Sequence, residues 1–203
     1  MTTEWIVENL TAGKQYRFRV SAFSDLGQGH SSEETRLVRT HASEPSIIDR
    51  PVPMEVNTGS ISIHWVLPPS MGAHVKEFYV QHRGGTGSSR DFGDDKMQVV
   101  KFTEAKEAFH DYCTRTVAKY EQELKLLRAV KSMSQQKKAH MKFLRQKRKR
   151  EHKKDLKYMG QKGTDGTQLV RLATRITGLE PGMMYQFRIA AANRVGRGQY
   201  SDP

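Results

Sequence analysis

Leu179-Glu-Pro-Gly-Met-Met-Tyr-Gln-Phe-Arg-Ile189 decides the fold, because the chain carries a second version of this stretch. The other version is Leu10-Thr-Ala-Gly-Lys-Gln-Tyr-Arg-Phe-Arg-Val20, which lies 169 positions earlier. In both, apolar and polar residues alternate from the tyrosine onward, the period of a β-strand with one buried face. A glycine turn precedes each strand and a Gly-x-Gly loop follows it, so each strand is bounded by turns. A unit that recurs in register indicates a repeat architecture.

The spacing from leucine to tyrosine adds a specific expectation. Leu10 precedes Tyr16, and Leu179 precedes Tyr185, by the same number of residues. This spacing predicts a tyrosine corner, in which the phenol packs at the sandwich edge and its hydroxyl bonds backbone a few residues upstream.

The chain resembles a fibronectin type III domain in two stretches. Residues 178–201, with Tyr185 and the ending Gly196-x-Gly198-x-x-Ser201, resemble its second half. Residues 51–82 resemble its first half, with Pro51-Val-Pro53 opening strand A, Ser60–Pro69 as strand B and Val75–His82 as strand C. The resemblance implies a mainly β fold with an α insertion, built on immunoglobulin-like β-sandwiches in tandem. The side chains expected in the sandwich core are Trp65, Phe78, Leu179, Tyr185, Phe187 and Ile189.

The N-terminal copy is incomplete. Residues 1–43 supply counterparts of only the last three strands, E to G, expected near Glu4–Glu8, Lys14–Phe23 and Thr35–Arg39. Half a sandwich leaves an open strand edge and an exposed core face. We therefore expect a partial domain at 1–43, completed by further sequence or by another chain, and a full domain at 44–203.

The full domain is interrupted. Residues 44–102 and 164–203 together make 99 residues, the size of one sandwich domain. Residues 103–163 are surplus and fall between an expected strand C′ at Met97–Phe102 and an expected strand E at Gln168–Arg175. Replacing 103–163 with a short Gly-Ser loop is accordingly predicted to leave a folded sandwich.

The insertion is predicted to be helical, because Glu104 to Met159 contains no Gly or Pro and is rich in helix formers. A helical hairpin with its break at Ser132-Met-Ser134 brings the chain back to the sandwich, and a single rigid arm with a disordered return is the alternative. An apolar seam spaced by three and four residues suits coiled-coil packing of the first arm. The seam residues expected to pack the arm are Phe109, Val117, Tyr120, Leu124 and Leu127. Cys113 lies on the same seam. The second arm offers a weaker seam of Met141, Leu144, Leu156 and Met159.

Charge is concentrated in the return arm. The 21 residues from Lys137 to Lys157 contain eleven Lys or Arg and only two acidic residues, Glu151 and Asp155. This segment therefore carries +9 of the chain's net charge of +12. Such clustering is typical of polyanion binding, while a merely solvated helix that keeps the arm soluble is the alternative. The residues expected to contact an acidic partner are Lys142, Arg145, Lys147, Arg148, Lys149, Arg150, Lys153 and Lys154.

The composition argues against several classes of protein. Cys113 is the single cysteine, so an internal disulfide framework is excluded and a reducing compartment is favoured. No apolar run is long enough to span a membrane and no N-terminal stretch has signal-peptide character. The eight histidines show no metal-ligand spacing, and we find no catalytic constellation, so no enzyme activity, cofactor or metal is expected.

Fold alone does not give function. Tandem type III domains are similar to those of cytoskeletal, muscle and ciliary scaffolds, so we expect a structural protein of a large intracellular assembly. Its expected setting is the cytoplasmic cytoskeleton or ciliary axoneme, with tubulin's acidic surface as a candidate partner. Nucleic-acid binding through the same basic run is the second hypothesis, although no aromatic residues interleave with Arg145–Lys154 for base stacking. An extracellular adhesion or receptor fragment is the third, for which Asn9-Leu-Thr11 is a glycosylation sequon.

Overall fold

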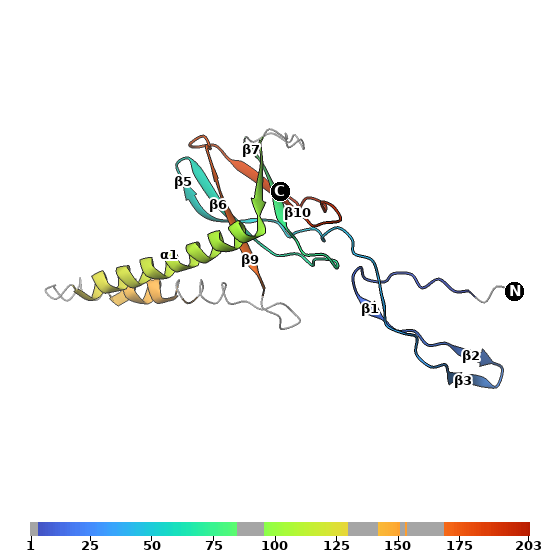
Figure 1. Cartoon of the computed structure of the whole chain (residues 1–203). Helices are drawn as coiled ribbons and strands as arrows, with labels where there is room; N and C mark the ends of the chain where they lie inside the picture. The colour runs from blue at the N-terminus through green and yellow to red at the C-terminus, as the bar shows by residue number, and fades with distance from the viewer. Residues whose placement is uncertain (1–3, 85–95, 130–141, 151–152, 154–168) are drawn as a thin grey trace.

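The structure is a computed structural model that describes residues 4–84, 96–129, 142–150, 153 and 169–203 (Figure 1). Two three-stranded antiparallel sheets form a β-sandwich. The first has the order β5-β6-β9, with β5 at Val52–Asn57, β6 at Ser60–Val66 and β9 at Arg171–Thr177. The second has the order β10-β7-β8, with β10 at Tyr185–Ala192, β7 at Glu77–Gly84 and β8 at Met97–Lys101. The chain is thus mainly β with a helical insertion, an immunoglobulin-like sandwich as the sequence predicts.

The core lies between these two sheets. Ile63 and Trp65 point inward from β6, since residues two apart share one face of a strand. They meet Phe78 and Val80 from β7, and the Trp65 and Phe78 rings pack edge to face with centroids 5.2 Å apart. Of the six expected core residues, four are buried and two are half-buried at the margin of the cluster. The buried four are Trp65, Phe78, Leu179 and Ile189, and the half-buried two are Tyr185 and Phe187.

Two strand boundaries differ from the expectation. The expected strand C′ included Phe102, but β8 ends at Lys101 and Phe102 begins the helix. The expected strand E began at Gln168, whereas β9 begins at Arg171 and continues to Thr177. The reason for the second shift is register, because β9 pairs with β6 along its whole length, from Val66↔Arg171 to Ser60↔Thr177.

Both predicted tyrosine corners are confirmed. The Glu180 backbone N–H donates to the Tyr185 hydroxyl at 2.7 Å. The Thr11 backbone N–H donates to the Tyr16 hydroxyl at 2.8 Å. Each bond reaches five residues upstream, so the corner is bonded in the same way in both copies. The strands differ, because β10 is continuous whereas residues 17–20 of the first copy are not in a strand.

The N-terminal unit contains two pairs of short strands. β1 (Gln15–Tyr16) pairs with β4 (Val38–Arg39), and β2 (Ser21–Ser24) pairs with β3 (Gly27–Ser31). The strand expected at Glu4–Glu8 is wrong, because this segment has no strand beside it and stays irregular. Large apolar side chains are left in solvent here, with Trp5 88% and Val20 74% exposed.

Close backbone contact joins the two units at a pair of glycines. Gly13 and Gly72 both have positive φ, +68° and +89°. A Cβ added to Gly13 would lie 2.2 Å from the Gly72 Cα, so only glycine fits at this contact.

Removing the hydroxyl of one tyrosine tests how much the tyrosine corner stabilises the sandwich. Tyr185→Phe leaves the Glu180 N–H without its acceptor and should lower the free energy of unfolding by about 1 kcal/mol. Tyr16→Phe is the matched control, because it removes the same bond from the exposed unit and should change the main unfolding transition by less than about 0.5 kcal/mol. Urea denaturation followed by circular dichroism measures the free energy of unfolding of both variants. Equal decreases would contradict the expectation that only the Tyr185 corner stabilises the sandwich.

Candidate docking surface on the helical arm

The insertion begins inside the sandwich. α1 spans Phe102–Ala129, and the Phe102 backbone N–H donates to the Lys76 carbonyl at 2.9 Å. Glu104 in the first turn accepts from the Lys101 N–H at 3.3 Å, a position where a carboxylate also suits the helix dipole. Ala105 is fully buried in the sandwich core. The first turn of α1 is therefore part of the domain it interrupts.

The following turns of α1 cover the outer face of the β5-β6-β9 sheet. Ser62 and His64 point outward from β6, yet they are only 7% and 3% exposed. The Phe109 ring lies over this face, with its centroid 6.2 Å from that of His64. Figure 1 shows α1 leaving β8, passing β9 and continuing beyond the sheet. The base of the arm is fixed by packing on two strands, so its direction is set by the sandwich.

Burial at the contact between α1 and the sheet changes the pKa values of two side chains, one on each element. Desolvation, with a smaller contribution from the Arg171 charge, lowers the pKa of His64 from 6.5 to about 4. His64 is therefore neutral at pH 7. Burial also raises the pKa of the half-buried Cys113 thiol above its usual value, although the Arg171 charge opposes this. Cys113 is a packed thiol on α1, without the lowered pKa of a reactive cysteine.

The return part of the insertion lies beside the outer half of α1. Residues 142–150 are helical, and Figure 1 draws them in orange along the yellow end of α1. Arg148 Nε and Glu123 Oε2 form an ion pair at 3.1 Å that joins the two segments. A partly exposed pair of this kind stabilises by only about 0.5 kcal/mol. The two segments lie as a hairpin requires, while the predicted break at Ser132–Ser134 falls outside the described residues.

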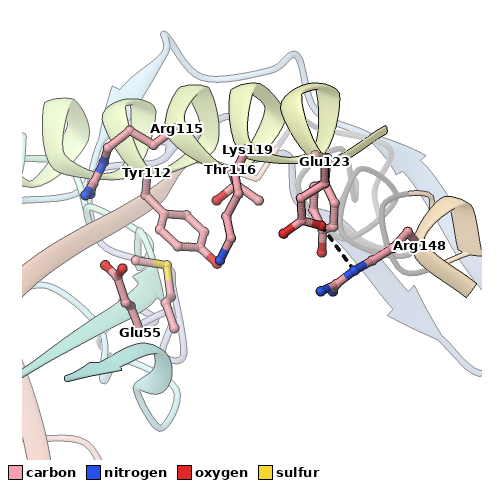
Figure 2. Close-up of a pocket in the computed structure, with 9 residues that line it drawn as sticks. Glu55, Tyr112, Arg115, Thr116, Lys119, Glu123 and Arg148 are labelled. Carbon is pink, nitrogen blue, oxygen red and sulfur yellow. Dashed lines mark ion pairs between the residues drawn. The ribbon is translucent and has the colours of Figure 1, made fainter. Parts of the chain in front are cut away.

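A cavity of about 230 Å³ opens where the arm leaves the sandwich (Figure 2). It lies between β5, α1 and the return segment. Arg115, Lys119 and Arg148 supply positive charge to its wall, while Glu55 and Glu123 supply negative charge. Its remaining lining residues are Met54, Tyr112, Thr116 and Tyr120. Because the charges are mixed, this cavity does not by itself select an anion.

The expected docking residues form an exposed cationic surface. Those exposed to solvent are Lys142, Lys147, Arg148, Lys149, Arg150 and Lys153. Arg145 is half-buried, and Lys154 lies outside the described residues. Because a helix turns 100° per residue, the run Lys147–Arg150 covers every side of its turn.

The apolar seam is divided between two environments. Phe109, Val117, Tyr120 and Leu124 are all half-buried. Phe109 packs on the sandwich, and Tyr120 lines the cavity beside the return segment. Leu127 lies in α1, but its side chain is outside the described part. Sequence reasoning missed the contact between α1 and the sheet, although the small residues Ala105 and Ala108 at the start of the helix were a signal for close approach.

Metal sites and membrane spans are not found in the described ranges. There, no group of three or more His, Cys, Asp or Glu is placed to hold a metal ion. No helix in that part of the chain has the length and apolar character to cross a membrane.

Comparison with known proteins gives no family assignment. No protein-family model matches the chain. Similar solved structures include the FN1–FN3 domains of chicken CNTN1, with 14% identity, a TM-score of 0.35, and coverage of 97% of this chain and 42% of that one. A multidomain segment of titin has 13% identity and a TM-score of 0.38, and the match covers 92% of this chain and 38% of that one. Titin kinase with its flanking domains has 12% identity and a TM-score of 0.37, with 80% of this chain and 16% of that one covered. The chain thus spans less than half the length of each, and these scores are too low to support an argument about function.

The buried histidine makes stability depend on pH. The folded chain resists protonation of His64 down to pH about 4, whereas the unfolded chain takes up that proton near pH 6.5. The contribution of neutral His64 to the free energy of unfolding is therefore fully present above pH 6.5. It is lost as the pH falls toward 4, by on the order of 2 kcal/mol. His64→Leu should remove this part of the pH dependence in urea titrations at pH 7 and pH 4.5, and His110→Leu, on the exposed side of α1, should leave it unchanged.

Two deletions separate the base of the arm from its outer part. Replacing 103–163 with a Gly-Ser loop removes Ala105 and Phe109 and uncovers His64, so the sandwich should fold with a Tm lowered by about 10 °C. Replacing only 118–163, with a linker of about 12 residues to span the return, keeps this packing and should lower the Tm by less than about 3 °C. Equal Tm values in calorimetry would show that α1 contributes nothing to the sandwich.

Proposed function

We propose that this chain is a non-enzymatic structural protein that docks on an acidic protein surface through the basic helical arm. The observation that carries the proposal is the exposed cationic run at 142–150, held on an arm whose base is packed into the sandwich. We further propose that the chain is a member of the fibronectin type III family. Its proposed domains are a partial unit at 1–43 and a full unit at 44–203, interrupted by 103–163.

The anchoring of the arm supports a docking role. α1 is joined to the core through Ala105, to the outer sheet face through Phe109, and to the return segment through Glu123. A helix of 28 residues extends about 42 Å at 1.5 Å per residue, so the arm reaches beyond the sheet, and the return segment carries its cations along the outer half of α1. A projecting arm lets a bulky domain reach a surface without steric conflict.

The charge pattern favours an acidic surface over a specific small ligand. Six exposed cations from one segment provide several weak contacts, each worth at most about 1 kcal/mol and screened by salt. Many such contacts give useful affinity only against a surface with repeated negative charge. Microtubules fit this requirement because tubulin presents an acidic surface with acidic tails. The proposed setting is therefore the cytoskeleton, in the cytoplasm or the ciliary axoneme.

Co-sedimentation with microtubules over a salt series tests the proposal. The variant K147Q/K149Q/R150Q removes three exposed cations while leaving Arg148 paired with Glu123, and it should weaken binding about tenfold or more. The control R19Q/R50Q/R194Q removes the same charge from exposed positions elsewhere and should weaken binding less than about twofold.

Two further measurements distinguish a protein partner from a nucleic acid. Proteolytic removal of the tubulin tails should reduce binding of the intact chain, and added RNA should compete only at high concentration. If RNA displaces the chain at low concentration, nucleic acid becomes the favoured partner through phosphate contacts. Equal binding of the arm variant and its control would reject the arm as the docking element.

A further inference from the structure

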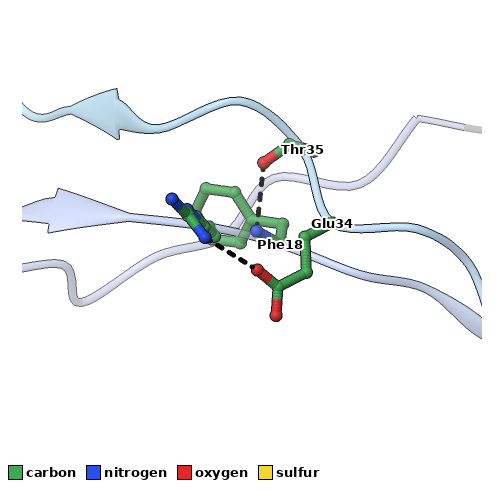
Figure 3. A network of polar contacts seen from close by, with 4 residues as sticks. Phe18, Glu34 and Thr35 are labelled. Carbon is green, nitrogen blue, oxygen red and sulfur yellow. Dashed lines mark hydrogen bonds and ion pairs between the residues drawn. The ribbon is translucent and has the colours of Figure 1, made fainter.

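The N-terminal unit is a hairpin whose two sides are bonded to each other beyond its short strands. The Phe18 N–H donates to Thr35 Oγ1 at 3.1 Å, and the Thr35 N–H donates to the Phe18 carbonyl at 2.8 Å. Arg17 and Glu34 form an ion pair at 3.3 Å beside these bonds (Figure 3). Other backbone bonds between the two sides join Ser32 with Val20 and Thr40 with Lys14. The hairpin can therefore be oriented as one body.

Residues 41–46 join this hairpin to the sandwich, and this linker is bonded to the loop that follows β6. The Ser43 N–H donates to the Met71 carbonyl at 3.1 Å, and the Ser46 N–H donates to the Pro69 carbonyl at 3.3 Å. Between them, Pro45 is buried. The linker is thus held along the domain by its own backbone.

The side chain of Asn193 ties the linker to a second part of the sandwich. Asn193 is 9% exposed and follows the end of β10. Its Nδ2 donates to the Ser43 carbonyl at 2.8 Å, and its Oδ1 accepts from the Val195 N–H at 2.8 Å. Longer bonds from the same Nδ2 reach the carbonyls of Ser70 and Ala73, at 3.4 and 3.5 Å. One buried amide therefore connects the linker, the loop after β6 and the turn after β10.

On the other side of the linker, the hairpin itself touches the sandwich. The Gly13 N–H donates to the His41 carbonyl at 3.0 Å, which places the hairpin corner against the linker. A Cβ added to Gly72 would lie 2.6 Å from the Gly13 Cα and 3.3 Å from the Ala42 Cα. Because backbone meets backbone here, the hairpin has little room to tilt toward the loop after β6.

We propose that residues 41–46 form a rigid joint that holds the N-terminal hairpin at one angle to the sandwich. Asn193 is the positioning residue of this joint, and the contact of Gly13 with Gly72 limits its movement. The base of α1 is also packed into the sandwich, through Ala105. The joint therefore fixes the hairpin and the base of the basic arm in one frame.

A flexible tether is the alternative, and the linker is poorly suited to that role. Its sequence is His41-Ala-Ser-Glu-Pro-Ser46, which contains no glycine. Flexible linkers are rich in glycine and serine, whereas proline restricts the backbone. Small contacts between units ordinarily allow relative motion, so the bonds of Ser43 and Asn193 are what distinguish this joint.

The distance distribution between two spin labels on the full chain tests the joint. Asp25→Cys at the tip of the hairpin and Thr58→Cys in the turn between β5 and β6 provide exposed label sites, in a Cys113→Ser background. Pulsed electron paramagnetic resonance should give a single narrow distribution. Asn193→Ser should broaden it about twofold or more, because a serine hydroxyl is too short to reach the Ser43 carbonyl.

A pair of glycine variants separates contact from backbone strain. Gly13→Ala puts a methyl group against Gly72 and should shift or broaden the distribution. Gly182 is the counterpart of Gly13 in the second copy, with a φ of +77° against +68°, but a Cβ there would have no atom within 4 Å. Gly182→Ala therefore introduces the same strain without the collision, and it should leave the distribution unchanged.

The labelled chain decides the proposal whichever result appears. A broad distribution without further substitution would show a flexible tether. The same narrow distribution in Gly13→Ala and Asn193→Ser, with the sandwich folded by circular dichroism, would show that neither contact sets the angle. Equal broadening by Gly13→Ala and Gly182→Ala would assign the effect to strain and overturn the role of the contact. None of these readouts involves binding by the basic arm, so the result is independent of the proposed function.

Discussion

The packing of α1 on the outer face of the β5-β6-β9 sheet is the contact on which the placement of the arm depends. A helix with few tertiary contacts is only marginally stable in water, so the outer turns need a fixed base. Ala105 supplies that base inside the core, and Phe109 extends it over His64. Because the sandwich sets the direction of the first turns, the basic segment that pairs with Glu123 is positioned by the β-domain and not by its own sequence.

This contact gives the two faces of the sandwich different characters. The outer face of β5-β6-β9 is covered, which places neutral His64 and buried Arg171 beneath a helix. The outer face of β10-β7-β8 carries cation–π contacts instead, with the Arg188 guanidinium 4.5 Å from the centre of the Tyr200 ring. An insertion between β8 and β9 therefore covers the outer face of the β5-β6-β9 sheet.

Much of the fold could be predicted because strand periodicity and turn residues are local signals. The alternation around Tyr185 and the spacing of the tyrosine corner predicted features that depend on neighbours close in sequence. The contact of Phe109 with His64 could not be predicted in the same way. His64 occupies an outward position of a strand, where a polar residue ordinarily meets water, and only the tertiary arrangement shows that a helix covers it. The basic run could be predicted from composition. Its ion pair with Glu123 could not, because that contact depends on how the chain returns along α1.

The two copies of the repeat show how far local bonding determines a structure. Tyr16 and Tyr185 make equivalent bonds, and Ser32 and Ser201 close equivalent turns. Yet Val20 lies in solvent while Ile189 lies in a core, because burial depends on neighbouring strands that, among the described residues, surround only the second copy. Local sequence is therefore sufficient to shape the corner and the final turn, whereas the continuous strand of Tyr185–Ala192 and the burial of its apolar face depend on the strands around it. The same division applies to the arm, whose helical form is local and whose position is tertiary.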